Sequence, residues 1–355
     1  MKATFLKIAQ VAPLFESVPP AHYGGTERVV ANLADELVRL GHQVTLFASA
    51  DSKTRATLVP ICPRALRLDT GCSDQLAWHV LMLESVAARS AQFDLVHFHI
   101  GHFHFPLLRR LDVPHVTTLH GRLDLPELGP LYAEFSDMPL ISISDAQRRP
   151  LAAANWIATI HHGLPETLLT FQPQPGDYLA FLGRISPEKR VDRAIAIATA
   201  LGWPLRIAAK VDPADVEYFE QDVQPLLANP LVEFIGEIGD GEKNSFLGRA
   251  RALLFPIDWP EPFGLVMIEA LACGTPVVAF RAGSVEEVIE HDRTGFIVDS
   301  VDEAIEATKR AMTIDRPVCR RSFEQRFTVR RMVERHVAVY AEVINARATQ
   351  VQVAI

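Results

Sequence analysis

Short apolar runs and helical stripes alternate along the first half of the chain. Val29, Leu33 and Leu37 fall on one face of a helix predicted over residues 26–40, which ends at Gly41. The apolar runs predict buried β-strands over residues 4–12, 44–48, 95–98, 116–119 and 140–143. This succession is typical of a parallel sheet covered by helices, so we predict an α/β fold.

The same alternation begins again in the second half of the chain. Residues 171–176 form a polar, proline-rich stretch without periodicity, which we interpret as a linker between domains. Beyond it, apolar runs predict strands over residues 178–183, 205–209, 232–235, 252–256 and 275–280. The sequence therefore predicts two α/β domains, over residues 1–165 and 166–328.

A helical stripe follows the second domain. Val329, Val333, His336 and Tyr340 share one face of a helix predicted within residues 329–355. This apolar face requires a partner, and the expected partner is the first domain. A contact between two copies of the chain is the alternative, and the sequence does not separate the two.

The composition is that of a globular enzyme. Of the 355 residues, 48% are hydrophobic and 22% are charged, which argues against a disordered or fibrous chain. The net charge of -8 argues against a partner held by general phosphate attraction, so no nucleic acid is expected. Four cysteines without a CxxC pair indicate reduced thiols in a cytoplasmic protein.

No membrane anchor is expected from the sequence. Lys7 and Gln10 interrupt the apolar N-terminal run before it reaches the length of a signal-peptide core. The uncharged stretch over residues 150–165 contains polar side chains and is bounded by prolines, so it does not resemble a transmembrane helix. Any membrane contact would be peripheral.

Doubly wound sheets bind ligands at the carboxyl ends of their strands, and polar loops are predicted there. Gly24 and Gly25 precede the first helix, where a backbone amide can approach a donor phosphate or an acceptor. A plain tight turn explains them equally well. In the second domain, Arg184 and Lys189 follow the first strand and could clamp a diphosphate. The alternative there is a solvated loop with a surface ion pair to Glu188.

A third loop carries two glutamates and opens a helix. Glu261 precedes this helix and Glu269 lies within it. The amides of Phe263, Gly264 and Leu265 would offer an anion site at the helix N-terminus. A buried Glu269 needs a hydroxyl or a cationic partner, and a ribose diol supplies the hydroxyls. A salt-bridged surface face is the alternative interpretation of the two acids.

Four histidines lie close together in the first domain: His97, His99, His102 and His104. Their spacing suggests a metal site. However, phenylalanines alternate with them and no carboxylate lies close in sequence. We therefore interpret them as side chains that line the acceptor side or pack in the core, and expect no metal.

The spacing of Glu261 and Glu269 is that of an E-x7-E motif, and the chain resembles the retaining family 4 glycosyltransferases. Arg184 and Lys189 resemble the cationic loop of that family. The resemblance covers nearly the whole chain through further short motifs, which are Gly24-Gly25, Asp94-Leu-Val-His97, Thr118-Leu-His120-Gly121, Ile143-Ser144, His162-Gly163 and Gly283-Ser284.

This resemblance implies a GT-B fold, in which two Rossmann-like domains with parallel sheets face each other across a cleft. It implies that the second domain holds a nucleotide-diphosphate sugar, with the backbone near Ile238 beside the base, and that the first domain holds the acceptor. UDP-glucose is the preferred donor because it is common in the family, and GDP-mannose stays open. The acceptor can be a small molecule, a lipid or a glycan.

The resemblance also implies roles for individual residues. It places Arg184 and Lys189 on the diphosphate and Glu269 on the ribose. It places Glu261 on the hydroxyls of the transferred sugar and His120 near the reacting face of that sugar.

The implied mechanism retains the anomeric configuration without a metal, a cofactor or a protein nucleophile. The leaving phosphate accepts the proton of the acceptor on one face of an oxocarbenium-like sugar, while the protein supplies positioning and electrostatic stabilisation. Double displacement through Glu261 is disfavoured. Two positions depart from the family pattern: Arg190 stands where glycine is common, and Ser284 replaces a second glycine.

Other functions are compatible with the same fold. A nucleotide-sugar epimerase or a phosphorylase-like enzyme shares the architecture, and a non-catalytic nucleotide-sugar binder would keep it as well. A dehydrogenase is disfavoured because no G-x-G-x-x-G follows the first strand of either domain. Turnover of nucleotide sugars would distinguish an enzyme from a binder.

Overall fold

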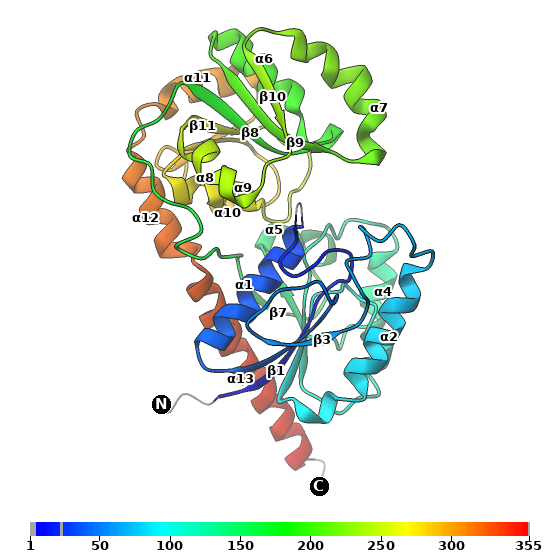
Figure 1. The fold of residues 1–355 in the computed structure, drawn as a ribbon. Helices are drawn as coiled ribbons and strands as arrows, with labels where there is room; N and C mark the ends of the chain where they lie inside the picture. The colour runs from blue at the N-terminus through cyan, green and yellow to red at the C-terminus, as the bar shows by residue number, and fades with distance from the viewer. Residues whose placement is uncertain (1–4, 22–23, 354–355) are drawn as a thin grey trace. The chain divides into compact units, whose positions relative to one another are not determined.

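The computed structural model describes residues 5–21 and 24–353. Residues 1–4, 22–23 and 354–355 lie outside the described residues, and with them His22 and Tyr23 of the Gly24 loop. The chain forms two compact units (Figure 1). The first unit comprises Met1–Gly163 and Val329–Ile355, and the second unit comprises Leu164–Thr328.

The first unit is built on a seven-stranded parallel sheet in the order β3-β2-β1-β4-β5-β6-β7. The order reverses between β1 and β4, which pair with Gln10 opposite His97. Covering helices bury β4 and β6 completely, in agreement with their mainly apolar sequences. The strands are β1 (Lys7–Val11), β2 (Gln43–Ala48), β3 (Thr57–Pro60), β4 (Leu95–Phe98), β5 (His115–Thr118), β6 (Leu140–Ser142) and β7 (Trp156–Thr159).

Helices cover both faces of this sheet. Neighbouring residues of β2 point to opposite faces: Phe47 shares a core cluster with Met82 of α2, and Leu46 shares another with Val30 of α1. In Figure 1, α13 lies beside α1. The helices of this unit are α1 (Gly25–Arg39), α2 (Gln75–Ala87), α3 (Phe105–Leu108), α4 (Leu128–Glu134), α5 (Asp145–Arg148) and α13 (Val329–Val353).

The C-terminal helix α13 packs on the first unit, as the predicted fold class implied. Tyr340 is fully buried, with its hydroxyl 2.7 Å from Nδ1 of His97 and 3.2 Å from Nε2 of Gln10. Arg335 donates a hydrogen bond to the carbonyl of Thr159 at 2.7 Å. The apolar face of the helix is thus covered within the chain, and these contacts require no second copy.

The second unit is built on a six-stranded parallel sheet in the order β10-β9-β8-β11-β12-β13. Its order reverses at β8, which lies between β9 and β11. Residues 171–176, which we interpreted as a linker, belong to this unit, because Gln172 N bonds Cys273 O at 3.0 Å. The strands are β8 (Tyr178–Ile185), β9 (Leu205–Val211), β10 (Val232–Gly236), β11 (Ala250–Phe255), β12 (Val277–Phe280) and β13 (Gly295–Val298).

One buried arginine ties several elements of the second unit together. The Arg316 guanidinium donates hydrogen bonds to the carbonyls of Gln172 at 2.8 Å, Gly248 at 2.7 Å and Ala250 at 3.0 Å. It also donates to Oγ1 of Thr275 at 2.8 Å. The helices of this unit are α6 (Val191–Leu201), α7 (Val216–Tyr218), α8 (Asp240–Gly248), α9 (Leu265–Cys273), α10 (Val285–Val288), α11 (Val301–Ala311) and α12 (Arg316–Arg326).

Replacing Arg316 by leucine should therefore destabilise the second unit strongly. The change leaves three carbonyls without their donor, and we expect a loss of about 3 kcal/mol in the free energy of unfolding. Chemical denaturation monitored by circular dichroism measures this loss. Arg321→Ala is the matched control, because Arg321 is an exposed arginine of the same helix, 4.0 Å from Asp315. Equal stability of the two variants would contradict the assigned role.

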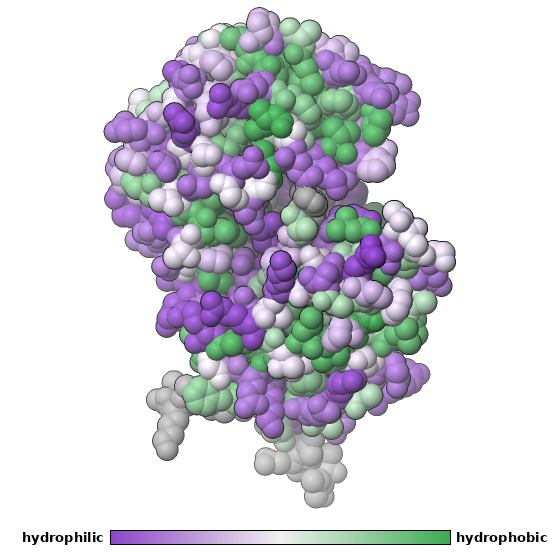
Figure 2. Space-filling view, in the orientation of Figure 1, coloured by the Kyte–Doolittle hydropathy of each residue, from purple (hydrophilic) through white to green (hydrophobic). Residues whose placement is uncertain are grey.

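The surface of each unit is mainly hydrophilic on the face shown in Figure 2, with smaller hydrophobic areas between the polar ones. Among the described residues, no helix combines the length and the hydrophobicity needed to span a membrane.

Candidate functional site

The loops that carry the predicted site residues of the second unit lie at the carboxyl edge of its sheet. Lys189 and Glu261 follow β8 and β11, which are adjacent strands at the point where the strand order reverses. In open α/β sheets this position is the usual ligand site. The topology therefore brings together two loops that are far apart in sequence.

Lys189 and Glu261 form an ion pair in this position. Lys189 ends a short 3-10 turn, Pro187–Lys189, and its Nζ contacts Oε2 of Glu261. The indole Nε1 of Trp259 donates to the same oxygen at 3.0 Å. Both partners are largely buried, since the exposed fractions of their side chains are 15% and 13%. Two residues that the sequence analysis singled out separately are thus in direct contact.

Arg184 lies near the end of β8 and is surrounded by acids. Its Nη2 bonds Glu188 at 2.6 Å, which is the pair that the sequence analysis kept as an alternative. Its Nη1 bonds Asp215 at 3.1 Å and lies 3.6 Å from Asp212. A diphosphate bound by Arg184 would compete with these carboxylates for the guanidinium.

The departure at Arg190 leaves the loop geometry suited to glycine. Arg190 has φ 52° and ψ 50°, in the left-handed region where a residue with a side chain is strained. Its guanidinium is held at 2.8 Å by Asp192 and at 2.8 Å by Asp258. These ion pairs fix the Arg190 side chain next to Lys189 in the sequence.

The second departure, Ser284, supports the loop that carries Glu261. Ser284 is fully buried, its N–H donates to the Glu261 carbonyl at 3.0 Å, and its Oγ donates to the Phe263 carbonyl at 2.8 Å. Gly283 has φ 54°, and a Cβ there would lie 2.2 Å from the Glu261 carbonyl oxygen. Only glycine fits at position 283, whereas the serine at 284 adds a side-chain hydrogen bond that glycine could not make.

Glu269 lies inside α9 and is 3% exposed. Its Oε1 accepts a hydrogen bond from Nζ of Lys243 on α8 at 2.8 Å, so the cationic partner foreseen for a buried Glu269 is Lys243. Among the described residues, only this oxygen of the carboxylate has a hydrogen-bond partner. The other oxygen is able to accept a hydrogen bond from a ligand hydroxyl.

The N-terminus of α9 is shaped by Gly264. This residue is the N-cap, with φ 75° and ψ 72°, and Leu265 is the first residue of the helix. Phe263 precedes the cap and is buried, so of the three residues expected at the helix N-terminus only Leu265 lies within the helix. Ile238 lies in the loop between β10 and α8, at the same edge of the sheet.

The first unit carries Gly25 and His120 at the carboxyl edge of its own sheet. Gly25 is the first residue of α1, after the N-cap Gly24, and is exposed. A Cβ at Gly24 would lie 2.7 Å from Cβ of Pro20, so the close approach of the chain requires glycine there. His120 follows β5, and its ring stacks on His162 with centroids 5.3 Å apart.

The histidines near His120 contact different side chains of the first unit. His97 Nε2 lies 2.7 Å from Oγ1 of Thr118, and His104 Nε2 lies 2.7 Å from Oγ1 of Thr117 on the opposite face of β5. His99 contacts His120, with 2.9 Å between Nδ1 and Nε2. In the part of the chain that the structure describes, no group of three His, Cys, Asp or Glu side chains could hold a metal ion.

Burial determines the charge of these histidines. Desolvation lowers the pKa of His120 to about 3 and that of His336 to about 4. It lowers the pKa of His97 and His99 well below the ordinary value, and the mutual repulsion of the imidazoles adds to this effect. The cluster is therefore neutral near pH 7.

Lys243 and Trp259 bind the two glutamates and were not predicted from the sequence. Lys243 is 26 positions from Glu269, and no local pattern joins them. Trp259 stands two residues before Glu261, so an indole donor close to the acid was a signal that the sequence did contain. Both contacts depend on how the loops fold back on each other.

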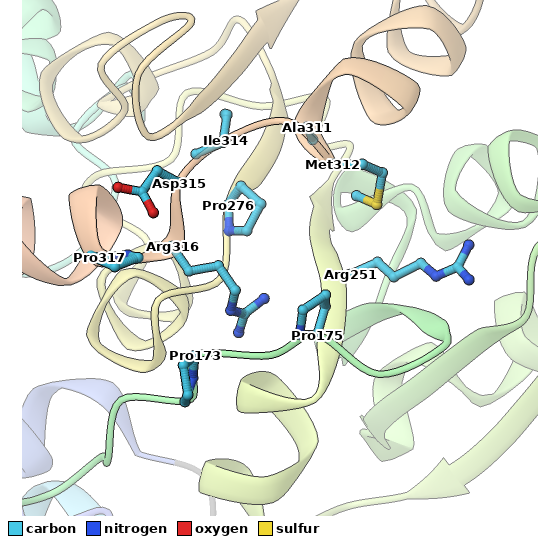
Figure 3. A pocket seen from close by; sticks show the side chains of 10 residues that line it. All are labelled: Pro173, Pro175, Arg251, Pro276, Ala311, Met312, Ile314, Asp315, Arg316 and Pro317. Carbon is cyan, nitrogen blue, oxygen red and sulfur yellow. The ribbon is translucent and has the colours of Figure 1, made fainter.

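A hollow of about 200 Å³ lies at the opposite, amino-terminal edge of the second sheet (Figure 3). Arg251 near the start of β11 and Pro276 just before β12 line it, together with Arg316. The Arg316 guanidinium is already engaged by backbone carbonyls, so the hollow offers no free charged group from that residue. It lies apart from the loops described above.

The chain has two α/β units, each built on a parallel sheet with polar loops at its carboxyl edge. This architecture is that of a GT-B protein. The family model for Glycosyltransferase Family 4 matches residues 23–219, and the model for Glycosyl transferases group 1 matches residues 171–324. The chain belongs to glycosyltransferase family 4 and is a glycosyltransferase. The predictions of family, fold class and enzyme class are confirmed.

Known relatives and solved structures extend this result. The glycogen synthase of Mycobacterium tuberculosis is 27% identical, over 78% of this chain and 79% of its own. AviGT4, a glycosyltransferase involved in avilamycin A biosynthesis, has a TM-score of 0.73 at 26% identity and covers 96% of this chain and 98% of its own. HepE of Anabaena, solved with UDP and glucose, has a TM-score of 0.72 at 18% identity, with 95% and 100% covered, and shows the fold alone.

Proposed function

We propose that this glycosyltransferase moves a hexose from a nucleotide-diphosphate sugar to an acceptor hydroxyl with retention of configuration and without a metal. UDP-glucose is the preferred donor, and HepE, a protein of the same fold, was solved with UDP and glucose. The acceptor class is left open among small molecules, lipids and glycans.

The observation that carries this proposal is the Lys189–Glu261 pair at the strand reversal of the second sheet. A leaving diphosphate gains negative charge as the glycosidic bond breaks, and a fixed, largely buried cation stabilises that charge more strongly than a solvated one. When the diphosphate binds Lys189, the Glu261 carboxylate is released to accept hydrogen bonds from sugar hydroxyls. One ion pair thus supplies both groups that the reaction needs.

The other residues of this edge fit the same ligand. Arg184 would hold the diphosphate, and the free oxygen of Glu269 would accept a ribose hydroxyl. The N-terminus of α9 at Gly264 and Leu265 adds a partial positive charge for the terminal phosphate. The front-face mechanism then requires no protein nucleophile, because the leaving phosphate takes the proton of the acceptor.

A donor screen tests the proposal. The purified protein is mixed with UDP-, GDP-, ADP- and dTDP-sugars in EDTA, and both its thermal stability and the hydrolysis of each donor are followed. We expect one class of donor to stabilise the protein and to be turned over, and NMR of the product to show the donor's anomeric configuration. Glu269→Ala and Arg184→Ala should abolish the stabilisation.

Arg310→Ala is the matched control for these variants. Arg310 is an exposed arginine of the same unit, with an ion pair to Asp292 at 2.8 Å. We expect its response to the donor to equal that of the unmodified protein. Binding without turnover would support a non-catalytic nucleotide-sugar binder, and no response to any nucleotide sugar would contradict the proposed function.

A further inference from the structure

A continuous chain of buried polar side chains runs through the first unit and ends at His120. It begins at α13, where Tyr340 contacts both Gln10 on β1 and His97 on β4. From Gln10 the chain continues through Nε2 of His99 at 2.7 Å, and from Nδ1 of His99 to Nε2 of His120 at 2.9 Å. All four of the residues before His120 are at most 3% exposed.

The hydrogen bonds of this chain have a direction. Nε2 of Gln10 donates to the Tyr340 hydroxyl, so Oε1 of Gln10 faces His99 and can only accept. Nε2 of His99 must therefore carry a proton. Since His99 is neutral, its Nδ1 is unprotonated and accepts the proton of Nε2 of His120.

The other ring nitrogen of His120, Nδ1, is then a hydrogen-bond acceptor. A neutral imidazole with a proton on Nε2 has a lone pair on Nδ1. Within the described residues this Nδ1 has no hydrogen-bond partner, although the atom is buried. An unpaired buried acceptor is costly, so a donor group that reaches it binds favourably.

We propose that Gln10 and His99 are positioning residues that hold His120 in the tautomer with its proton on Nε2, so that Nδ1 accepts a hydrogen bond from a hydroxyl of the bound substrate. This inference rests on the proposed function for its ligand, a sugar or acceptor hydroxyl. It does not rest on that function for the tautomer, which is a property of the free protein.

The first test is made without any ligand. The full chain is labelled with ¹⁵N-histidine, and correlation spectra that distinguish protonated from unprotonated ring nitrogens are recorded at pH 7.5. Assignment uses His120→Ala. We expect Nε2 of His120 to be protonated and Nδ1 to be bare. A proton on Nδ1, which the reversed direction of the chain would give, overturns the proposal.

The second test changes the residue that sets the direction. Gln10→Met removes the acceptor for His99 and should give a mixture of His120 tautomers. Thr117→Val is the matched control, because it removes a buried bond to His104 on the opposite face of β5. His99→Phe serves as the second variant if Gln10→Met does not fold. Unchanged tautomers in the folded variant contradict the role of this pair.

Kinetics then connects the tautomer to the ligand. Loss of one substrate hydrogen bond predicts a fall of about tenfold in kcat/KM for Gln10→Met. The same change made in a His120→Ala background should have no further effect, and an equal fall in both backgrounds overturns the proposal. If no nucleotide sugar is turned over at all, the proposed function fails, while the spectra still decide the tautomer.

Discussion

Lys189→Met is expected to lower kcat/KM for sugar transfer by about 10²- to 10³-fold, the usual effect of removing one electrostatic stabiliser of a transition state. Methionine keeps the length and apolar stem of the side chain but removes the charge that Glu261 contacts. The fall should appear mainly in kcat, because charge on the leaving diphosphate grows as the bond breaks. Steady-state kinetics with the donor found in the screen measures both constants.

A double variant of the Lys189–Glu261 ion pair separates an effect on folding from an effect on activity. Removal of Lys189 leaves Glu261 largely buried with the Trp259 indole as its remaining donor, and this alone destabilises the loop. Lys189→Met combined with Glu261→Gln removes the unpaired charge and should recover thermal stability without recovering activity. Lys309→Ala, an exposed lysine paired with Glu306, should change neither. Recovery of activity in the double variant would show that the loss came from folding.

The fold was predictable because most of its strands are largely buried. The runs over residues 95–98 and 178–183 are mainly apolar, and the structure places β4 and β8 there. The strands β3 and β13 were not predicted, for physical reasons. The edge strand β3 is partly exposed and lacks a continuous apolar run. The strand β13 begins at Gly295, and glycine does not indicate a strand. A Cβ at this position would lie 2.0 Å from the Val277 carbonyl oxygen, so close packing requires glycine there.

The candidate site was predictable only where residue type and loop position coincide. Lys189 and Glu261 were found because a cation and an acid follow predicted strands, and the strand order places them together. Lys243, Gln10 and Tyr340 were not assigned to a site, since each acts through a contact with a distant element. Gln10 is an example: on β1 it reads as a polar interruption of an apolar run, and its role becomes visible only when β4 and α13 are in place.

Acid should destabilise the first unit because of its buried histidines. Burial lowers the pKa of His336 from an ordinary 6.5 to about 4 and that of His120 to about 3. Between these values and 6.5 the unfolded chain binds more protons than the folded one, so stability falls as the pH falls. The stability that depends on these neutral histidines is fully present above about pH 6.5. A single histidine with a folded pKa near 4 loses roughly 2 kcal/mol by pH 5.

Several such histidines titrate in the same direction, so we expect the melting temperature to drop steeply between pH 7 and pH 5. The carboxyl of Glu27 acts against this trend, because burial raises its pKa and favours the folded state at lower pH. Differential scanning calorimetry across this range measures the slope.

His336→Met isolates the contribution of one imidazole. The variant removes a ring whose Nε2 has no partner among the described residues, while Nδ1 lies 2.8 Å from the Met332 carbonyl. We expect its melting temperature to depend less steeply on pH than that of the unmodified chain, whereas His291→Gln, at an exposed position, should keep the original slope. The two variants should differ because only the buried ring has to be desolvated in its charged form when the chain folds. If both variants keep the original slope, carboxylates rather than buried imidazoles control the acid response.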